Sequence, residues 1–372
     1  MTALKALSIS VIGLLLGVGL AYSHAQADQA LLRADISLHL PFSPRHPVNP
    51  FLLAEVAEVL SSQRIPYPQP FKPVYRMEVI SRAGRRLEYW LDFDGRCYDP
   101  RQRTLFERRA TSLVDFFSSQ VFAPSVPWDE VKEKFRVGSV ASLQDLETGL
   151  TVLIHRHGGT FHADVEPYTV KDTETLRAIY GGRWSWNRRA VILIVDGHRM
   201  AASMSLFPHG NYTIKDNGFP GHFCLHFSGS ITHGTRRVDP GHQTMILKAS
   251  GRLFAQVHAA DPAEVTRMAL IAINEEDSFL LRYLTTSLPT SPETLWGDLR
   301  YLEAQKIHLV SEDDTKASVQ VVLRIYRTSG GVERLERTLS LIRTGGRWLL
   351  NGDDLPLRVP PFSSPVRLYY PR

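Results

Sequence analysis

The side chains best suited to chemistry are concentrated between Phe207 and Gly234. This stretch holds one of only two cysteines, Cys224, and four of the fourteen histidines: His209, His222, His226 and His233. A cysteine is nucleophilic as the thiolate, and a neighbouring imidazole is the usual group that takes its proton. The spacing therefore predicts a cysteine nucleophile with its own base. The alternative is a buried, inert cysteine packed among structural histidines, which an isolated Cys-x-His would favour.

A second cluster of polar residues lies upstream, in the segment from His162 to Glu166. If this segment is extended, His162, Asp164 and Glu166 share one face, because side chains alternate along a strand. Later histidines would complete a zinc site, for which the candidate ligands are His162, Asp164, His222 and His226. A hydrogen-bonded polar seam that orients the histidines is the reading that the sequence favours, because no closely spaced metal motif is present.

Two indoles and two guanidiniums stand close together after a predicted helix. Trp184 and Trp186 can stack on sugar rings, and Arg188 can hold a carboxylate through forked hydrogen bonds. With His226 and His233 they form the predicted substrate-binding set. A packed corner of the domain explains the tryptophans and the arginine equally well, and the sequence leaves both readings open.

The order of these motifs resembles that of the bacterial L,D-transpeptidases, the YkuD-like proteins. Members of that family carry a His-Gly pair and, shortly after it, the sequence Ser-His-Gly-Cys-Ile/Val-Arg. This chain has Pro208-His209-Gly210 and then Gly221-His222-Phe223-Cys224-Leu225-His226, in the same order and at similar spacing. The resemblance extends over residues 138–250, and Phe223 and His226 stand where the family has glycine and arginine.

The resemblance implies that Cys224 attacks the carbonyl that joins an L-centre to a D-amino acid in a peptidoglycan stem peptide, giving a thioester. His209 would be the base, and His222 with the backbone amides of Phe223 and Cys224 would stabilise the oxyanion. An amine acceptor would then form a crosslink, whereas water would give a carboxypeptidase. No cofactor is implied, and His226 in place of arginine implies weaker carboxylate binding. The rival functions are a zinc-dependent D-amino-acid peptidase and a non-catalytic cell-wall binding protein.

The composition is that of a globular protein, with 43% apolar and 22% charged residues in a chain of 372 residues. The net charge of +5 and the pI of about 9.2 suit an anionic cell-wall or membrane surface. A ratio of 43 basic to 38 acidic residues, without a long basic cluster, does not predict nucleic acid binding. The sequence does not indicate an oligomeric state.

The N-terminus resembles an export signal, with Lys5, an apolar run over residues 6–22 and the small residues Ala25 and Ala27 around a cleavage site. The protein is therefore expected to work outside the cytoplasm, either secreted or anchored by this apolar segment. Export would permit a disulfide. Cys97 and Cys224 fall in different predicted domains, however, and free thiols are expected.

The predicted fold is a multidomain α+β protein. Its β-rich, L,D-transpeptidase-like central domain is flanked by a small N-terminal α+β domain and a C-terminal α+β cone-type domain that resembles nuclear-transport-factor-like modules. The expected segments are a signal peptide or anchor (1–27), a tether (28–50), the small α+β domain (51–125), the predicted catalytic domain (126–258), the nuclear-transport-factor-like domain (259–358) and a tail (359–372). The roles expected of the outer domains are substrate or partner binding for the first and binding or scaffolding for the second.

Four local expectations bear on this layout. The Pro-rich segment 65–70 is expected to interrupt regular structure. Cys97 is expected in the core of the small domain. One helix is expected from Asp239 to about Val257, and another is expected to begin at Ser291 and bury Leu295, Leu299 and Leu302. Antiparallel strands are expected at 306–310, 318–326, 333–342 and 348–350.

Overall fold

The computed structural model describes residues 31–40, 43–67, 71–288 and 299–355. The chain divides into two compact units between Phe117 and Ser118, and each is described by itself. The predicted leader, the tail and the start of the helix expected at Ser291 lie outside the described residues. In the part that is described, no helix has both the length and the apolar character that a membrane crossing needs.

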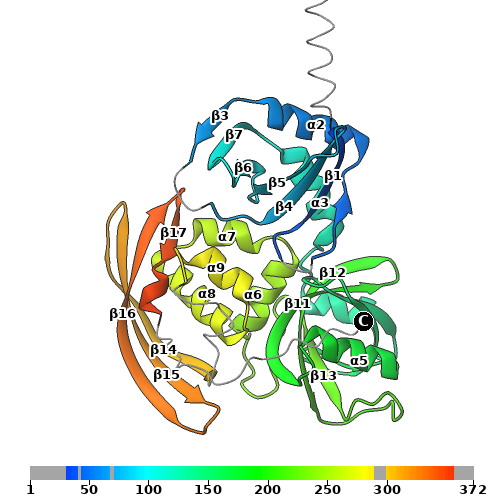
Figure 1. The fold of residues 1–372 in the computed structure, drawn as a ribbon. Helices are drawn as coiled ribbons and strands as arrows, with labels where there is room; N and C mark the ends of the chain where they lie inside the picture. Colours follow the sequence, from blue (N-terminus) through cyan, green and yellow to red (C-terminus); the bar gives the residue numbers. More distant parts are fainter. Residues whose placement is uncertain (1–30, 41–42, 68–70, 289–298, 356–372) are drawn as a thin grey trace, which may run out of the picture. The chain divides into compact units, whose positions relative to one another are not determined.

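The first unit is built on a seven-stranded antiparallel sheet in the order β2-β1-β4-β5-β6-β7-β3, with two helices (Figure 1). Its elements are β1 (Leu31–Leu38), β2 (His46–Pro47), α2 (Pro50–Ser61), β3 (Arg64–Pro66), β4 (Tyr75–Ser81), β5 (Arg86–Leu91), β6 (Arg96–Asp99), β7 (Thr104–Arg109) and α3 (Thr111–Val121). Cys97 on β6 is completely buried, which confirms the prediction that it belongs to the core.

Two expectations for this unit are wrong. The segment predicted as a tether contains β1, which pairs with β4 and buries Ala34 and Ile36 on alternate positions. The apolar residues recur with the two-residue period of a strand, although Asp35 and Ser37 between them are buried too, and the neighbouring prolines obscured this pattern. The Pro-rich segment also begins with a strand, because β3 ends at Pro66. Proline is tolerated there since β3 is the edge strand of the sheet.

The second unit begins with a closed barrel of six strands in the order β10-β13-β12-β11-β8-β9. Its elements are α4 (Trp128–Lys134), β8 (Val140–Asp145), β9 (Thr151–Gly158), β10 (Ala163–Pro167), α5 (Val170–Ile179), β11 (Ser185–Val195), β12 (His198–His209) and β13 (His222–His226). Apolar residues at alternate positions fill the interior, and Phe223, Leu225 and Phe227 supply them from β13 and the residue after it. The protein is therefore mixed helix and strand with a strand-rich part, as predicted at this coarser level, and the closed six-stranded barrel is a finding of the structure.

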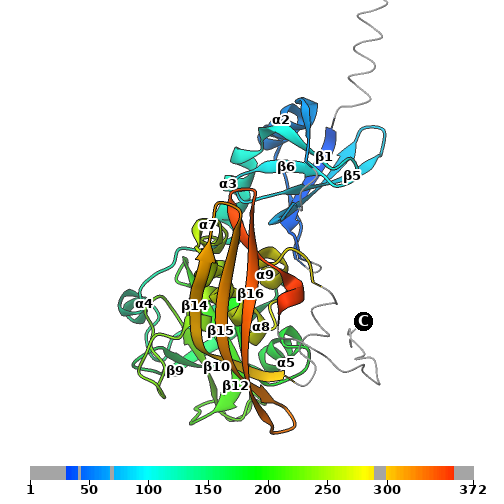
Figure 2. The ribbon, with the colours of Figure 1, turned by 90° about the vertical axis from the view of Figure 1, so that its left-hand side faces the viewer.

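Four helices follow the barrel, and a four-stranded antiparallel sheet follows them. The elements are α6 (Pro240–Ala249), α7 (Leu253–Ala259), α8 (Pro262–Asn274), α9 (Ser278–Leu284), β14 (Leu299–Glu312), β15 (Lys316–Arg327), β16 (Val332–Thr344), β17 (Arg347–Leu350) and the short 3-10 helix η1 (Gly352–Asp354). The helices lie between the barrel and the sheet in Figure 1, and Figure 2 looks through the sheet onto α8 and α9. A hollow of about 570 Å³ on the sheet is lined by Arg300, Tyr301, Glu303 and Tyr326.

Two helix predictions for this region are wrong. The helix expected from Asp239 to Val257 is two helices, because Gly251 between them takes a left-handed backbone with φ of 71°. The helix expected through Leu302 is strand β14 from Leu299 onward. The side chain of Asn274 exchanges two hydrogen bonds with the backbone of Leu302, at 2.7 and 2.8 Å, as a neighbouring strand would. Helical spacing of leucines did not reveal this tertiary contact.

Buried charges join the barrel to the helices. Lys248 on α6 is 1% exposed, and its Nζ lies 2.6 Å from Glu147 Oε1 and 2.5 Å from Asp277 Oδ2. Arg188 on β11 contacts Asp239 and Glu275 in the same way. Removing one partner of such a buried pair would leave the other charge uncompensated, so these contacts determine where α6 lies against the barrel. That position matters because α6 covers part of the histidine cluster.

Candidate active site

Cys224 and His209 meet at the junction of β13 and β12. The Cys224 Sγ lies 3.3 Å from His209 Nε2. On the other side of the ring, His209 Nδ1 lies 2.7 Å from the carbonyl oxygen of Phe207. A carbonyl only accepts hydrogen bonds, so Nδ1 carries the ring proton and Nε2 presents its lone pair to the thiol. The neutral imidazole is therefore held in the tautomer that a base for Cys224 requires.

Two irregularities in the barrel ladders bring these groups together. Between the pairs Ser205–Cys224 and His209–His222, three residues of β12 stand opposite Phe223 alone. On the neighbouring strand, β11 loses register between Ser185 and Arg188, where Trp186 stands without an opposite residue. Bulges bend a strand and redirect its side chains. Here they turn the end of β12 toward Cys224 and push Trp186 outward beside it.

Two glycines allow the ends of the connecting loop to approach the histidines. Gly210 has a φ of 62°, and a Cβ there would lie 2.4 Å from Cε1 of His222. Gly221 has a φ of 141°, and a Cβ there would lie 2.7 Å from the carbonyl oxygen of His209. Any larger residue would have to displace the rings or the backbone. The glycine of the His-Gly pair is thus required by close packing against His222.

The thiol and the base rest as neutral groups. Burial raises the pKa of Cys224 to about 12, and the negative charge of Asp164 adds to that rise. Burial also lowers the pKa of His209 below its usual value. The thiol is 8% exposed. The site therefore holds a neutral thiol beside a neutral general base, and this differs from a preformed thiolate–imidazolium pair.

Polar residues of β10 and β13 share the face that carries Cys224. Asp164 is the register partner of Cys224, so their side chains lie side by side. The predicted common face of His162, Asp164 and Glu166 is present, since the alternating residues Ala163 and Val165 belong to the apolar core. Asp164 Oδ1 lies 3.4 Å from His162 Nε2, 3.6 Å from His233 Nε2 and 3.8 Å from His222 Nε2.

Glu166 binds the loop between β12 and β13. It is completely buried, and its Oε1 accepts hydrogen bonds from the backbone N–H and the hydroxyl of Thr213 at 2.7 and 3.0 Å. Its Oε2 accepts from the backbone N–H of Ile214 at 2.7 Å. This carboxylate holds the loop that links β12 to β13, and with it the two glycines that flank the loop. The sequence placed Glu166 correctly on the face but did not indicate this contact.

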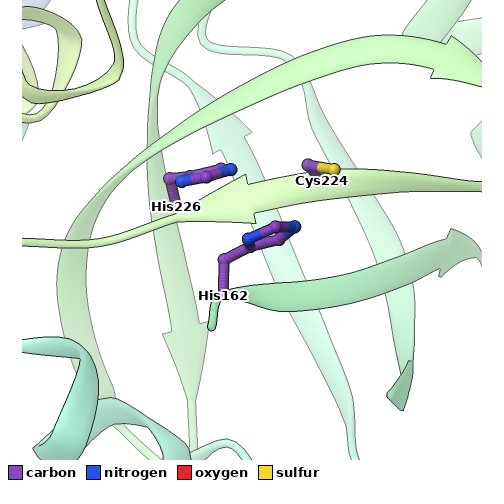
Figure 3. Close-up of side chains that lie close together, drawn as sticks. All are labelled: His162, Cys224 and His226. Carbon is purple, nitrogen blue, oxygen red and sulfur yellow. The ribbon is translucent and has the colours of Figure 1, made fainter. Parts of the chain in front are cut away.

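His226 is inside the molecule. It is 2% exposed, and its ring stacks on His162 at 4.1 Å and on His242 of α6 at 3.7 Å between centroids. Figure 3 shows the side chains of His162, Cys224 and His226 lying close together. Burial lowers the pKa of His226 and of His242 well below the usual value, so both rings are neutral at neutral pH. This position does not present His226 to a substrate carboxylate.

The other predicted substrate-binding residues have different surroundings. Trp186 is 51% exposed, stacks on Phe207 at 4.9 Å and lies 5.0 Å from the ring of His209. Trp184 packs edge-on against Phe219 beside the apolar core. Arg188 is occupied by Asp239 and Glu275. Only Trp186 among these three therefore lies at the surface beside the thiol and its base, with His233 exposed near Asp164.

Sequence reasoning missed two contributors. Phe207 supplies both the carbonyl that orients His209 and the ring under Trp186. His242 closes the histidine stack, and its Nδ1 lies 2.9 Å from the hydroxyl of Ser203. A residue pattern does not reveal a hydrogen bond to a backbone carbonyl. The ring of Phe207 could have been noted from the sequence as an aromatic side chain two positions before His209.

Both cysteines are free, as predicted, and the thiol of Cys97 is fully buried. No model of a known protein family matches the chain, and no curated protein matches it either. The resemblance to L,D-transpeptidases stays a prediction.

Proposed function

We propose that this protein is a cysteine-dependent L,D-transpeptidase or L,D-carboxypeptidase that acts outside the cytoplasm on peptidoglycan stem peptides. One observation carries the proposal: His209 Nε2 faces Cys224 Sγ at 3.3 Å while Phe207 holds the other ring nitrogen. A nucleophile with an oriented base is the arrangement that acyl transfer uses. The order of the His-Gly and His-x-Cys motifs supports the family, and the apolar N-terminal run supports the location.

In the first half-reaction, the thiol proton moves to His209 Nε2 as Cys224 Sγ attacks the carbonyl carbon of the L–D peptide bond. The hydrogen bond from Nδ1 to the Phe207 carbonyl stabilises the imidazolium that forms. Collapse of the tetrahedral intermediate breaks the C–N bond, and His209 returns the proton to the leaving amine. The stem peptide then remains on Cys224 as a thioester.

In the second half-reaction, an amine of another stem or a water molecule attacks the thioester while His209 takes its proton. The C–S bond breaks, and the proton returns to the sulfur as the free thiol forms. An amine gives a crosslink and water gives a trimmed stem, so both activities use the same residues. Which one dominates depends on access of the acceptor to Cys224.

The oxyanion needs donors that converge on one point. Phe223 and Cys224 are successive residues of β13, and successive N–H groups of an extended strand point to opposite edges. One of these two amides can therefore face the oxyanion, but not both together. His222 is the second candidate, and its Nδ1 is anchored at 2.7 Å on the carbonyl of Asn211. Because Nδ1 donates to that carbonyl, Nε2 of the neutral ring presents a lone pair, and it can donate to the oxyanion only when the ring carries both protons.

The proposed substrate surface consists of Trp186 and Phe207 beside His209. Their stacked rings are 51% and 38% exposed, which suits a sugar ring or an apolar part of the stem. The interior position of His226 and the occupied state of Arg188 leave His233 as the predicted contact for a carboxylate. Carboxylate recognition is accordingly expected to be weak.

The test is covalent labelling of the full chain with a carbapenem and, separately, with iodoacetamide, followed by intact mass and peptide mapping. We expect one adduct at Cys224, absent in Cys224→Ala and strongly slowed in His209→Ala. Cys97 is an internal control, because its buried thiol should stay unlabelled while the chain is folded.

Labelling at Cys97 alone would contradict the proposal. An unchanged labelling rate at Cys224 in His209→Ala would contradict it too. A folded protein whose Cys224 does not react, but which sediments with purified sacculi, would instead favour the wall-binding alternative. Circular dichroism of each variant separates lost reactivity from lost folding.

A further inference from the structure

We propose that a zinc-class divalent cation binds beside Cys224 through His162 Nε2, Asp164 Oδ1 and His233 Nε2. Each of the three residues offers a ligand atom, and these atoms lie within 4.8 Å of one another. The site shares one strand face with the thiol, because Asp164 is the register partner of Cys224. The inference does not depend on the thiol acting as a nucleophile, and it can fail or succeed separately from the proposed function.

The spacing of the ligand atoms fits a tetrahedral ion. With metal–ligand bonds of about 2.0–2.2 Å, the ligands of a tetrahedral zinc lie roughly 3.3–3.6 Å apart. His162 Nε2 and His233 Nε2 lie 3.4 and 3.6 Å from Asp164 Oδ1. Both separations are those expected between two ligands of one tetrahedral zinc ion. Such distances are too long for hydrogen bonds with good geometry.

The lone pairs at this point need a cation. His162 Nδ1 lies 2.9 Å from the carbonyl of Ile231 and must carry the ring proton, so Nε2 presents a lone pair. That lone pair faces the carboxylate oxygen Asp164 Oδ1. Both atoms are buried, and neither has a hydrogen-bond partner among the residues that the structure describes. Two facing acceptors without donors are unfavourable in the interior, and a bound cation removes the conflict.

The hydrogen bonds made by these rings match those of metal-binding histidines. Such a histidine usually donates its other ring N–H to a carbonyl or carboxylate, which orients the ring. His162 does this toward Ile231, and His222 does it toward Asn211 at 2.7 Å. His222 Nε2 then presents a further lone pair 3.8 Å from Asp164 Oδ1. We place the ion on the side of His162 and His233 because the separations there are shorter.

Two nitrogen ligands and one oxygen ligand leave a fourth position of a tetrahedral ion open. His233 is half-exposed, with 52% of its side chain accessible, so a group from solvent can approach the site from the side of His233. Closed structural zinc sites use four protein ligands, whereas sites with an open position can hold water or a substrate group. A carboxylate of the stem peptide is one group that could take that position, and this link alone rests on the proposed function.

A second donor set competes for the same histidine. His162, Cys224 and His226 are all buried and also lie within 4.8 Å of one another (Figure 3). An ion there would bind sulfur and block the thiol. We favour the site at Asp164 because a carboxylate supplies its charge without first losing a proton at neutral pH, whereas a thiol must be ionised to bind a metal.

The experiment uses the full chain without a histidine tag, stripped with a chelator and dialysed against zinc chloride. We expect one zinc per chain by elemental mass spectrometry, and loss of that zinc in His233→Ala and in Asp164→Asn. Cys224→Ala should keep its zinc. His198→Ala is the matched control, because His198 is an exposed histidine at a barrel turn. Circular dichroism verifies that each variant is folded.

Cobalt(II) provides a second readout, since cobalt bound to sulfur has an intense charge-transfer band in the near ultraviolet. We expect visible ligand-field bands without that sulfur band. Absence of bound zinc in the wild type would overturn the inference, as would retention of zinc in folded His233→Ala. Loss of zinc in Cys224→Ala together with a sulfur band would assign the ion to the competing set. Thiol labelling in chelator tests the proposed function independently.

Discussion

The side chain of Asp164 lies directly across the strand pair from Cys224, with Asp164 on β10 and Cys224 on β13. A carboxylate beside a buried thiol opposes ionisation, and together with burial it raises the pKa of Cys224 to about 12. The carbonyl of Phe207 holds Nδ1 of His209, so the neutral ring presents Nε2 to Cys224 as the acceptor for the thiol proton. Ionisation of the Cys224 thiol therefore depends on proton transfer to His209.

The first prediction concerns the pH dependence of Cys224 alkylation. The raised pKa of the thiol and the lowered pKa of His209 both favour the neutral pair near pH 7. The thiolate fraction should therefore grow steadily as the pH rises toward about 12, and the alkylation rate should rise with it. Stopped-flow alkylation with iodoacetamide in chelator measures the profile. A plateau across about pH 5 to 8 would instead indicate a stable thiolate–imidazolium pair.

The second prediction separates close packing from backbone strain at two glycines of one loop. Gly221→Ala should destabilise the fold and displace His209, because the new Cβ meets the His209 backbone at 2.7 Å. Gly218 also has a positive φ, of 72°, but no atom lies within 4 Å of the Cβ that Gly218→Ala would add. Its cost should be about 1–2 kcal/mol from the left-handed backbone alone.

Urea denaturation and alkylation of Cys224 provide the two readouts for these glycines. Gly221→Ala should lose more stability than Gly218→Ala, and it alone should show the slow alkylation of His209→Ala. Equal effects of the two substitutions on alkylation would show that packing against His209 is unimportant.

The third prediction concerns the carboxylate that holds the loop. Glu166→Gln keeps the shape of the side chain but places an amide nitrogen where an acceptor is needed, so one of its three hydrogen bonds must be lost. The cost should be about 1–3 kcal/mol, as expected for a buried hydrogen bond to a charged group. Hydrogen exchange at the amides of Thr213 and Ile214 should accelerate. Unchanged exchange at both amides would contradict this account.

The fourth prediction compares two tryptophans. Trp186→Ala should change stability by less than about 0.5 kcal/mol, because the ring is an exposed surface group. It should nevertheless reduce sedimentation with purified sacculi and leave iodoacetamide labelling of Cys224 unchanged. Trp184→Ala is the matched control and should destabilise the barrel, since Trp184 packs on Phe219 and the core. Wall binding that survives Trp186→Ala would remove this residue from the proposed substrate surface.

Much of the local structure could be predicted from residue patterns. The capped start of α8 is an example: the side chain of Asp261 accepts a hydrogen bond from the backbone N–H of Glu264, and Pro262 occupies the first turn. Strand alternation also predicted the shared face of His162, Asp164 and Glu166. Errors arose where tertiary contacts overrode local preference, as at Leu302, whose helical spacing gave way to pairing with Asn274 and β15.

The sequence alone determined the composition of the site: one cysteine among histidines, with glycines at the loop ends and a polar strand upstream. Side-chain type and spacing specify these features, because each depends only on local chemistry and on the periods of helix and strand. Tertiary structure alone decided the use of each group. Burial and strand register made His226 an interior residue, paired Arg188 with Glu275, placed Asp164 beside Cys224 and brought the carbonyl of Phe207 to His209. These relations join segments that are distant in the chain, or involve backbone atoms that every residue shares.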